Sequence, residues 1–597
     1  MKKEKEPIGI QEADILTCLY REPYVSQRLL SEKTGHSLGV VNRCLRTLWE
    51  AGYLDDMTQL TPEARRLFSE TAPRNAIILA AGFGMRMVPI NLTAPKALLE
   101  VNGERLIDRL ILQLKEAGIR DITVVVGFMK ESLEYLMDMY GVDLVVNEEY
   151  AVRNNMASLG RVLDRLGNTY VVPCDIWCDH NPFRAQELYS WYMVSDLVDP
   201  DSAVRVNRKM ELVRVPEEEA GNAMIGIAYL LEEDAGKVRE DIRRMLADGR
   251  HDDSFWEDAL YGKDRMRVRA RVVHSTDVVE INTYEQLREL DADSRQLKSD
   301  AIRTIGRVLE CREEEIQEIS VLKKGMTNRS FLFSVRGRQY IMRIPGEGTD
   351  ALINRAQEAE VYRTIRGLGL CDDPVFMDPC SGFKITRYLD GVRTCDPLKE
   401  EDLVRCMEKL RGFHEMHLKT DHAFDLFGQI DFYERLRGGQ PSAYRDYGET
   451  YGKVMQLKAW LDTLPRDFCL THIDAVPDNF LFYPGENGEE LQLTDWEYSG
   501  MQDPHVDLAM FSIYSLYDRK QADHLMDLYF RGSCPPRTRA KIYAYMAVCG
   551  LLWSNWCEYK HTLGVEFGAY SLRQYRYAKD FWRCAMEAEE GPGKCTL

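Results

Sequence analysis

The first 73 residues repeat apolar side chains every three or four positions, which predicts amphipathic helices. This spacing runs through residues 13–20, 25–35 and 37–54, and a Gly-containing turn separates the last two segments. Ser37 stands where the third helix would begin, and its hydroxyl suits an N-cap. A further helical segment, 61–68, follows a brief polar stretch. This order of elements is typical of a winged helix-turn-helix.

The pattern changes after Arg74, where continuous apolar runs alternate with helical segments. Short apolar runs predict buried strands, and their alternation with helices predicts βαβ units around a parallel sheet. The expected strands cover 75–81, 122–128, 142–148 and 169–177, and the expected helices cover 105–118 and 131–141.

A third pattern begins near residue 298, with two strand-like segments joined across a turn and then a helix at 354–369. The length of 597 residues also favours several domains, since one domain usually holds about 150. We therefore predict a multidomain α/β protein. Its expected parts are a winged helix-turn-helix over 1–73, a Rossmann-like domain with a mostly parallel sheet over 74–297, and a third domain over 298–597.

Charge and cysteine usage narrow the class of protein. Lys and Arg number 77 against 96 Asp and Glu, which gives a net charge of −19. This charge argues against non-specific binding of nucleic acid but allows a local anion pocket.

The fifteen cysteines include no zinc-finger pair, and Cys174, Cys178 and His180 lack a second pair of ligands, so we expect reduced thiols. Neither an export signal nor a run of eighteen apolar residues occurs, so we expect a cytoplasmic protein without a membrane span.

The Gly-rich segment after the first expected strand carries candidate chemistry. It reads NAIILAAGFGMR, and NLTAPKALLEVNG follows. Backbone N–H groups at Gly82 and Gly84 can approach a triphosphate, while Arg86 and Lys96 can offset charge that develops on the α-phosphate and pyrophosphate. A plain glycine turn would not require these two cations. The string LAAGxGxR followed by PKAL resembles the nucleotidyltransferase superfamily, which implies catalytic roles for Arg86 and Lys96 and nucleotide contacts from Leu79, Ala80, Ala81, Gly82 and Gly84.

Asp175 closes another expected strand, and this fold class places a Mg²⁺ ligand at such a strand end. Within the superfamily, residues 75–292 most resemble bacterial CTP:phosphocholine cytidylyltransferases, including the strings AVRNNMASL and DSFWED. That family has a second metal carboxylate in an EID triplet, where this chain has Glu280-Ile281-Asn282. An amide oxygen coordinates Mg²⁺ without supplying charge, so the second ligand stays open between Glu280 and Asn282.

Aromatic residues in this block are candidates for cation–π contact with a quaternary ammonium. Phe255 and Trp256 are the stronger candidates, and Tyr229 and Tyr189 are the weaker ones. Each of them, taken alone, is more commonly a core residue.

The third block contains the strings THIDAVPDNFLF and LTDWEYSG. The order and spacing of His472, Asp474, Asn479 and Asp495 resemble the catalytic loop and metal-binding acid of kinases. Loop capping would explain an isolated Asp or Asn, but neither the His nor the buried strand before Asp495. The resemblance implies a bilobal protein-kinase-like domain. In it Asp474 would accept the proton of a substrate hydroxyl, and Asn479 and Asp495 would hold Mg²⁺ on ATP.

Arg343 lies in the second strand of this block, where kinases keep a phosphate-binding basic residue, and Glu358 is its expected ion-pair partner. The chain has no GxGxxG, and residues 324–328 read KGMTN. Both departures resemble the choline/ethanolamine kinase and aminoglycoside phosphotransferase group, whose substrates are small alcohols. The resemblance assigns Thr327, Asn328, Arg343 and Glu358 to the nucleotide.

The string GLLWSNWCEYK places Trp553, Trp556 and Tyr559 on one helical face. Choline carries a permanent positive charge without N–H donors, so aromatic faces and carboxylates are its natural partners. Choline kinases have a similar W-x-x-W helix, and Trp496, beside Asp495, joins this candidate set. An amphipathic helix without a binding role shows the same spacing. The neighbouring cytidylyltransferase-like block favours the interpretation as a choline-binding helix.

The N-terminal block resembles MarR-like winged-helix families. In these the helix from Ser37 would lie in a DNA major groove with Asn42, Arg43 and Arg46 exposed. Residues 1–73, however, hold ten Lys and Arg against eleven Asp and Glu, whereas a DNA reader is usually basic on one face. DNA binding and docking to a protein both stay open.

Together the two large blocks are interpreted as consecutive steps. ATP would phosphorylate choline, and CTP would then transfer CMP to phosphocholine, giving CDP-choline and pyrophosphate, with Mg²⁺ as cofactor. One alternative is an ethanolamine or sugar kinase fused to a sugar-phosphate nucleotidyltransferase. Another is a transcription regulator whose large domains sense ligands, although the intact set Lys96, Asp175, Asp474, Asn479 and Asp495 argues against inactive sensors.

Overall fold

The computed structural model describes residues 8–84, 87–90, 94–216, 219–263, 265–322, 328–346, 353–371, 373–485, 488–562 and 567–590. The chain divides into two compact units, Met1–Arg303 and Thr304–Leu597. The division falls inside helix α10 (Asp300–Leu309), and the finer boundaries expected at 73 and 297 stay predictions.

The first unit begins with a small helical bundle. Its helices are α1 (Ile10–Arg21), α2 (Gln27–Thr34), α3 (Leu38–Glu50) and α4 (Pro62–Thr71). Ser37 caps α3 as predicted, because its hydroxyl accepts a hydrogen bond from the Val40 N–H. Leu54 pairs with Leu60 in an isolated antiparallel bridge at the position of the wing. Buried side chains of the four helices share one hydrophobic core, which confirms the predicted winged helix-turn-helix.

The rest of the first unit is built on one mixed sheet. Among the described residues its strands are β1 (Asn75–Ala80), β4 (Asp121–Val126), β5 (Asp143–Val146), β6 (Thr169–Pro173), β8 (Trp191–Asp199), β9 (Val204–Val206), β10 (Glu211–Arg214), β11 (Gly221–Leu230) and β12 (Arg265–Val273). Their order across the sheet is β5-β4-β1-β6-β11-β8-β12-β10-β9. The first four are parallel, as predicted, whereas β11 runs antiparallel to β6 and β8. The βαβ half is confirmed, and a largely antiparallel half extends it.

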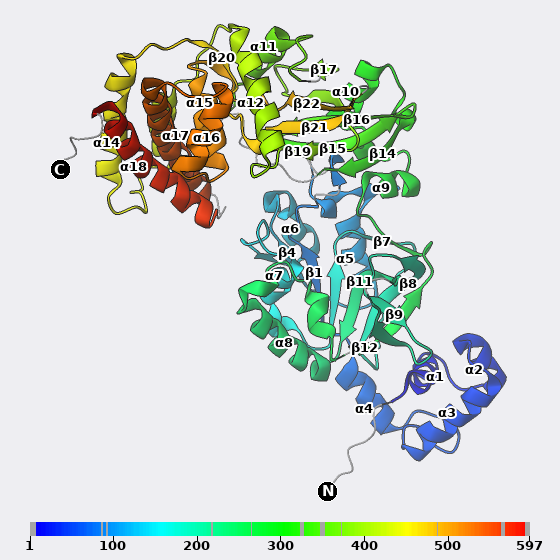
Figure 1. Ribbon diagram of the computed structural model, residues 1–597. Helices are drawn as coiled ribbons and strands as arrows, with labels where there is room; N and C mark the ends of the chain where they lie inside the picture. Colours follow the sequence, from blue (N-terminus) through cyan, green and yellow to red (C-terminus); the bar gives the residue numbers. More distant parts are fainter. Residues whose placement is uncertain are drawn as a thin grey trace. The chain divides into compact units, whose positions relative to one another are not determined.

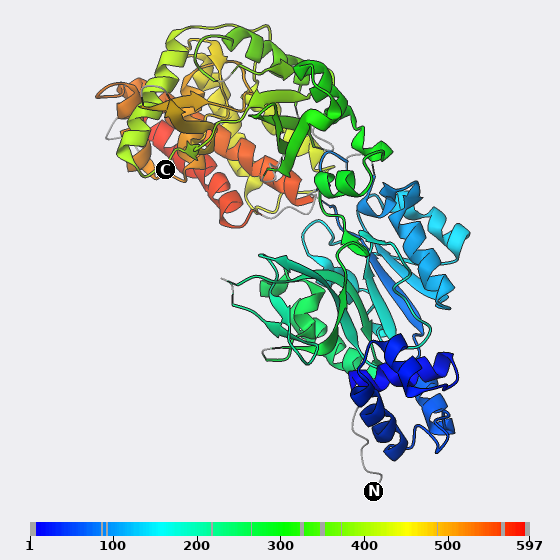
Figure 2. The same cartoon turned by 90° about the vertical axis from the view of Figure 1, so that its right-hand side faces the viewer.

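Helices cover both faces of the parallel half, and the side chains of β1 show why. Ile78 points into a core shared with α5 (Leu106–Glu116), while Ile77 points into a core shared with α8 (Glu232–Leu246). Successive side chains on a strand face opposite sides of the sheet, so an unbroken apolar run must be buried on both. Figure 1 and Figure 2 show α5 and α8 on opposite sides of this sheet.

Smaller elements complete the first unit. They are β2 (Glu100–Val101), β3 (Glu104–Arg105), α6 (Tyr135–Tyr140), α7 (Asn155–Gly160), β7 (Ile176–Cys178), β13 (Val278–Glu280) and α9 (Tyr284–Leu290). β7 follows β6 directly and pairs antiparallel with β13, with Ile176 opposite Glu280. This pairing brings the end of the domain beside the carboxyl end of β6.

The winged helix-turn-helix joins the sheet through a very short connection. Residues 72–74 separate α4 from β1. The Tyr229 hydroxyl donates to the Thr71 carbonyl, and Asn168 Nδ2 donates to a second carbonyl at the end of α4. Leu188, from the segment before β8, belongs to the hydrophobic core of the helical bundle. The two parts are therefore packed together rather than tethered.

The second unit begins with α10 and an antiparallel sheet. Among the described residues this sheet contains β14 (Ile316–Val321), β15 (Asn328–Val335), β16 (Arg338–Pro345), β17 (Phe376–Met377) and β18 (Lys384–Arg387), in the order β14-β15-β16-β18-β17. β15 and β16 are the predicted pair joined across a turn, and α11 (Arg355–Ile365) confirms the predicted helix.

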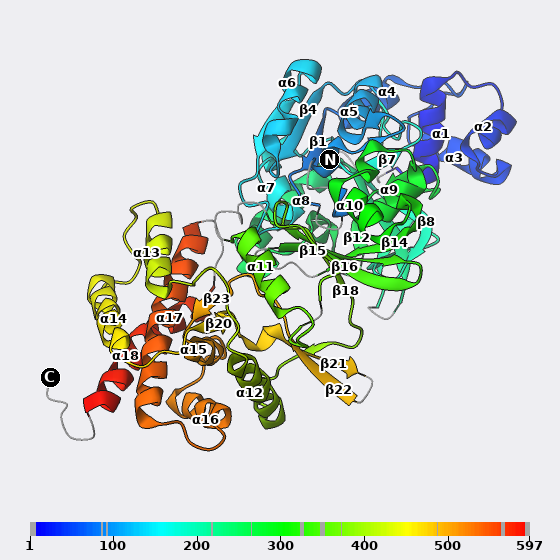
Figure 3. The ribbon, with the colours of Figure 1, turned by 90° about the horizontal axis from the view of Figure 1, so that it is seen from above.

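The remainder of this unit is mostly helical. Its helices are α12 (Glu400–Glu415), α13 (Leu426–Leu436), α14 (Tyr447–Asp462), α15 (His505–Tyr514), α16 (Arg519–Tyr529), α17 (Pro536–Thr562) and α18 (Ala569–Glu590). Its strands are β19 (Arg393–Thr394), β20 (Cys469–Thr471), β21 (Phe480–Gly485), β22 (Gly488–Leu493) and β23 (Gly500–Gln502). Figure 3 shows α13, α14, α15 and α18 around α17, and all four contact it. A strand-rich part followed by a helical part confirms the predicted bilobal domain. No helix in the described part of the chain combines the length and apolarity that crossing a membrane requires.

Two leucines of α5 test the packing of the first unit. Leu114 is fully buried, so Leu114→Ala should lower the free energy of unfolding by about 2–5 kcal/mol through the cavity it leaves. Leu112 is 53% exposed on the same helix, and Leu112→Ala should cost at most about 0.5 kcal/mol. Urea-dependent hydrogen exchange of the β1 and β4 amides in the full chain measures both. Equal losses would contradict the assigned faces.

Candidate active sites

The loop after β1 holds the first candidate site. Gly84 has a φ of +64°, a left-handed conformation that favours glycine. A Cβ at Gly84 would lie 2.7 Å from Lys96 Cγ, so the lysine side chain lies directly against this backbone. No heavy atom of the described residues would lie within 4 Å of a Cβ at Gly82. Gly84 thus makes room for the Lys96 side chain, and Gly82 leaves its own backbone accessible to a ligand.

The Lys96 ammonium joins two predicted metal ligands. Nζ lies 2.7 Å from Asp175 Oδ2 and 2.7 Å from Asn282 Oδ1. Asp175 follows β6 and Asn282 follows β13, and the Ile281 N–H donates to the Asp175 carbonyl at 2.9 Å. The Lys96 and Asp175 side chains are only 11% and 14% exposed, so water screens their attraction weakly. The structure brings these three residues together.

Glu280 belongs to a neighbouring cluster with Tyr192, Trp256 and Glu257. Burial, followed by the charges of Asp258 and Glu280, raises the pKa of Glu257 to about 7. The Tyr192 hydroxyl donates to Glu257 Oε1 at 3.2 Å, and the Tyr192 and Trp256 rings lie 6.3 Å apart. Within the described residues Glu257 Oε2 has no hydrogen-bond partner. Two acids beside two aromatic rings form a cluster that a cation would stabilise.

The other aromatic candidates of this unit lie elsewhere. Phe255 is 51% exposed, whereas Trp256 is buried. Tyr229 and Tyr189 contact the winged helix-turn-helix, the first through its hydroxyl and the second through its ring. Their positions give them a role in the joint between the two parts.

Sequence reasoning missed Tyr192 and Glu257. Glu257 was visible as the acid next to Trp256 in DSFWED, but Tyr192 lies in an ordinary apolar strand and gives no signal. Leu79, Ala80 and Ala81 are buried at the end of β1, as a strand below a loop requires. Three assignments lie outside the described residues: Arg86, Thr327 and the side chain of Asn328.

A buried carboxylate shapes the loop of the second unit that carries the kinase-like motif. Asp507 Oδ1 accepts from the Ile473 N–H at 2.7 Å, and its Oδ2 accepts from the His472 N–H at 3.0 Å. His414 Nε2 lies 3.0 Å from the same Oδ2. Ile473 has a φ of +71°, which is unfavourable for a β-branched residue. The hydrogen bonds to Asp507 therefore hold a strained loop in place.

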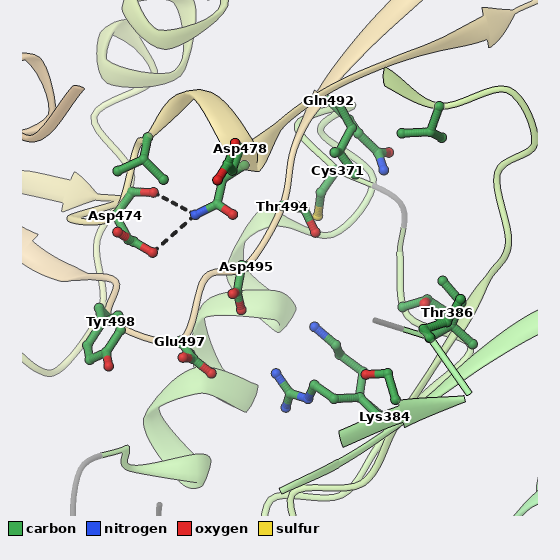
Figure 4. Close-up of a pocket in the computed structure, with 18 of the residues that line it drawn as sticks. Cys371, Lys384, Thr386, Asp474, Asp478, Gln492, Thr494, Asp495, Glu497 and Tyr498 are labelled. Carbon is green, nitrogen blue, oxygen red and sulfur yellow. Dashed lines mark hydrogen bonds between the residues drawn. The ribbon is translucent and has the colours of Figure 1, made fainter. Parts of the chain in front are cut away.

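Asp474, Asn479 and Asp495 line one cavity above this loop. Asn479 Nδ2 donates to the Asp474 carbonyl at 2.8 Å and to Asp474 Oδ2 at 3.1 Å (Figure 4). Burial, followed by the charges of Asp495 and Glu497, raises the pKa of Asp474 to about 8. Only the ionised form of Asp474 can accept a proton, and the hydrogen bond from Asn479 fixes the orientation of its carboxylate.

Arg343 and Glu358 form the expected ion pair between β16 and α11. Arg343 Nη2 lies 2.9 Å from Glu358 Oε2, and Arg355 Nη1 lies 3.4 Å from the same oxygen. Although burial opposes it, the Arg343 charge holds the pKa of Glu358 below its ordinary value. The pair is buried, so it fixes α11 against the sheet.

The cavity, of about 1450 Å³, has a charged side and an aromatic side. In Figure 4, Asp495 and Glu497 lie between Asp474 and Lys384. The Trp553 and Trp556 rings lie 5.4 Å apart, and Tyr498 stands perpendicular to Trp553 at 6.0 Å. The aromatic side consists of Tyr498, Tyr514, Trp553, Trp556, Phe567 and Tyr570.

Trp496 and Tyr559, two further aromatic candidates, are not among the residues that line this cavity. Trp496 is fully buried against the rings of Phe413 and His472, and Tyr559 packs at the edge of the helical core. The string DWEYS carried a signal for two residues that sequence reasoning overlooked, Glu497 and Tyr498. The overlooked lining residues include Lys384, Glu497, Tyr498, Tyr514, Phe567 and Tyr570.

Both sites present oxygen atoms of the kind that a divalent metal prefers. Asp175 and Asn282 direct oxygens at one cation, the Lys96 ammonium, and Asn479 and Asp495 line the kinase-like cavity. Among the described residues no cluster of three His, Cys, Asp or Glu side chains is arranged to hold a metal. These residues therefore fit a divalent metal that also takes oxygen atoms from a bound triphosphate.

The residues proposed to face DNA lie on the exposed side of α3. Asn42, Arg43 and Arg46 are all exposed, as predicted. Arg43 Nη2 donates to Gln11 Oε1 at 2.6 Å, and Arg46 Nε donates to Glu50 Oε1 at 2.8 Å. Both arginines of this face are therefore already engaged within the helical bundle.

Three family models match the chain. A model described as winged helix-turn-helix DNA-binding matches residues 12–55, a MobA-like NTP transferase domain matches 76–184, and a phosphotransferase enzyme family matches 318–545. The folds and sites thus define a multidomain transferase of phosphorus-containing groups, with a nucleotidyltransferase part and a kinase part.

Relatives identify the nucleotidyltransferase part more closely. Choline-phosphate cytidylyltransferase of Streptococcus pneumoniae is 33% identical over 222 residues, 36% of this chain and 96% of that protein. The 2-aminoethylphosphonate cytidylyltransferase of Lancefieldella rimae is 30% identical over 242 residues, 37% of this chain and 94% of that protein. For the kinase part, a solved structure of the choline kinase LicA from S. pneumoniae is 29% identical to this chain. The match covers 47% of this chain and 97% of that one, with a TM-score of 0.42. The chain belongs, through its nucleotidyltransferase part, to the choline-phosphate cytidylyltransferase family, and it fuses this enzyme to a kinase.

Gly84→Ala should lower nucleotidyl transfer more than about tenfold, because the new Cβ would displace Lys96 from Asp175 and Asn282. Gly103→Ala is the matched control. Gly103 also has a left-handed φ, of +79°, but its Cβ would meet no described heavy atom within 4 Å. Both variants place an alanine in the left-handed region, which costs roughly 1–2 kcal/mol in each. Pyrophosphate release measures the rate, and equal losses would show that backbone strain, not Lys96, is responsible.

Asn282→Asp should lower the metal concentration for half-maximal nucleotidyl transfer by about threefold or more, because it adds a charged oxygen beside Asp175. Asn282→Ala removes the oxygen and should raise that concentration. Metal titrations of the initial rate test both variants. A metal dependence that neither variant changes would assign the second ligand to Glu280 instead.

Proposed function

We propose that the chain makes CDP-choline in two steps. It transfers the γ-phosphate of ATP to the hydroxyl of choline, and it then transfers CMP from CTP to phosphocholine. One observation carries this proposal: a domain of the choline-phosphate cytidylyltransferase family shares a chain with a kinase cavity that is lined by both aromatic rings and carboxylates. The product of the first reaction is the acceptor in the second.

In the first reaction the hydroxyl oxygen of choline attacks the γ-phosphorus of ATP, and Asp474 takes the hydroxyl proton. The bond from that phosphorus to the bridging oxygen breaks, and ADP leaves. Asp474 lines the cavity, and the hydrogen bond from Asn479 to its Oδ2 orients the carboxylate for this role. Asp507 contributes by holding the loop rather than by touching the substrate.

The cavity supports choline over a sugar as the acceptor. A sugar offers many hydroxyls and needs many hydrogen-bonding partners, whereas a trimethylammonium group offers none and is attracted to aromatic faces. Trp553, Trp556 and Tyr498 supply such faces, and Glu497 adds a negative charge. Ethanolamine, whose ammonium has three N–H donors, is the nearer competitor.

In the second reaction a phosphate oxygen of phosphocholine attacks the α-phosphorus of CTP. The bond to the bridging oxygen breaks and pyrophosphate leaves, while the Lys96 ammonium offsets charge on the phosphates. The trimethylammonium group would contact Tyr192 and Trp256, whose carboxylate neighbours are Glu257 and Glu280. The same combination of rings and acids thus recurs in both parts.

Mg²⁺ is the metal that we propose, because it is the usual partner of nucleoside triphosphates. Asp175 and Asn282 would hold it in one part, and Asn479 and Asp495 in the other, where it would supply positive charge to the phosphates. The ligands are then choline, ATP, CTP and phosphocholine, and we place the reactions in the cytoplasm, where both nucleotides are made. DNA binding by the winged helix stays a prediction.

The test is incubation of the pure chain with choline, ATP, CTP and Mg²⁺, followed by mass spectrometry for phosphocholine and CDP-choline. Asp474→Asn should reduce phosphocholine formation by at least about a thousandfold and leave cytidylyl transfer to supplied phosphocholine within twofold. Lys96→Met should do the reverse. The absence of both products from the wild-type reaction would overturn the proposal.

Substrate choice is decided by parallel reactions with ethanolamine and with glucose as kinase acceptors. The phosphorylated forms and 2-aminoethylphosphonate serve as cytidylyl acceptors. We expect the highest kcat/KM with choline and with phosphocholine. A preference for ethanolamine or glucose would leave both transferase activities in place and show that choline is not the substrate.

A further inference from the structure

Two cations lie side by side in the sheet of the kinase part. Arg343 on β16 is directly opposite Lys384 on β18, so both side chains leave the same face of the sheet. Each meets a residue of α11, Arg343 at Glu358 and Lys384 at Tyr362, one helical turn further on. The four residues form two parallel links between sheet and helix.

The guanidinium of Arg343 is largely occupied. Its Nη1 and Nη2 both donate to Glu358, and Nη2 also donates to the Gly382 carbonyl at 3.3 Å. Arg355 approaches the same carboxylate, so Glu358 is held from two sides. Arg343 therefore turns its two-pronged end toward α11. Three of its five N–H groups are used, and Nε has no hydrogen-bond partner among the described residues, so the two cations differ in where their ends point.

Lys384 is placed differently. Its Nζ donates to the Tyr362 hydroxyl at 2.8 Å and lies 4.0 Å from Glu358 Oε1, the edge of ion-pair range. An ammonium has three N–H donors, and within the described residues this is the one hydrogen bond that Nζ makes. Two donors are therefore available.

These donors face the cavity that holds the catalytic groups. Lys384 is 8% exposed yet lines the same cavity as Asp474 and Asp495, and Figure 4 shows its side chain extending toward Asp495. Burial and the Arg343 charge lower the pKa of Lys384 to about 8. A buried ammonium with unused donors is costly, and an anionic group in the cavity would stabilise it.

We propose that Lys384 is a second phosphate-binding residue of the kinase site, which holds the triphosphate of ATP, while Arg343 mainly anchors α11. This inference rests on the proposed ATP-dependent function. A polyphosphate is the anion that fits, because its oxygens can accept from the free donors of Nζ while the metal ligands Asn479 and Asp495 lie across the same cavity.

The experiment compares nucleotide affinity with nucleoside affinity in the full chain. Lys384→Met, which keeps the length of the side chain, should weaken ATP and ADP binding by about ten- to hundredfold in calorimetry with Mg²⁺. Adenosine lacks phosphates, so its dissociation constant should change less than about twofold. Lys384→Arg should restore most of the ATP affinity, since it supplies a cation with donors.

Tyr362→Phe is the matched control for a structural role. It removes the hydrogen-bond partner of Lys384 and leaves the ammonium in place, so we expect ATP affinity within about threefold of wild type. An equal loss of adenosine and ATP affinity in Lys384→Met, or no loss of ATP affinity at all, would overturn the role in phosphate binding. A wild-type chain that bound no ATP would instead overturn the proposed kinase function, and the inference with it.

Discussion

Each catalytic part of this chain depends on a cation, largely or fully shielded from water, that holds oxygen atoms from distant segments. Lys96 draws Asp175 and Asn282 together, although these residues follow strands far apart in the sequence. Arg343 does the same for Glu358 and so fixes α11 against its sheet. Removing a cation from water is costly unless oxygen atoms surround it. The cation of each site therefore needs its oxygen partners, and this need fixes where those residues lie. The elements around each site are therefore positioned by charge as well as by packing.

The negative net charge of the chain affects which ligands its sites attract. A net charge of −19 repels nucleoside triphosphates at long range, so binding relies on a few local cations. The same acidity suits a cationic acceptor. Acids accompany aromatic rings in both parts, Glu257 with Trp256 and Glu497 with Trp553. The two parts have unrelated folds, so this likeness does not come from shared architecture; it is the combination that the proposed quaternary ammonium substrate requires.

Much of the fold was predictable because its signals are local. The apolar run at β1, the Gly-rich turn and the kinase-like loop each specify a structure through adjacent residues. The antiparallel half of the first sheet was not predicted, because pairings such as β11 with β8 depend on long-range contacts. Tyr192 and Lys384 were missed for the same reason. Each lies in a strand of ordinary pattern and gains its role only from residues that the fold brings beside it.

The short connection between α4 and β1 has a consequence for any partner of the winged helix. A domain on a flexible linker samples many orientations, and its partner is held only at an average distance. Here three residues and two hydrogen bonds to the end of α4 replace such a linker. A molecule held by the exposed face of α3 would therefore face the cytidylyltransferase sheet at one fixed angle. Recruitment through this helix would orient the enzyme as well as concentrate it.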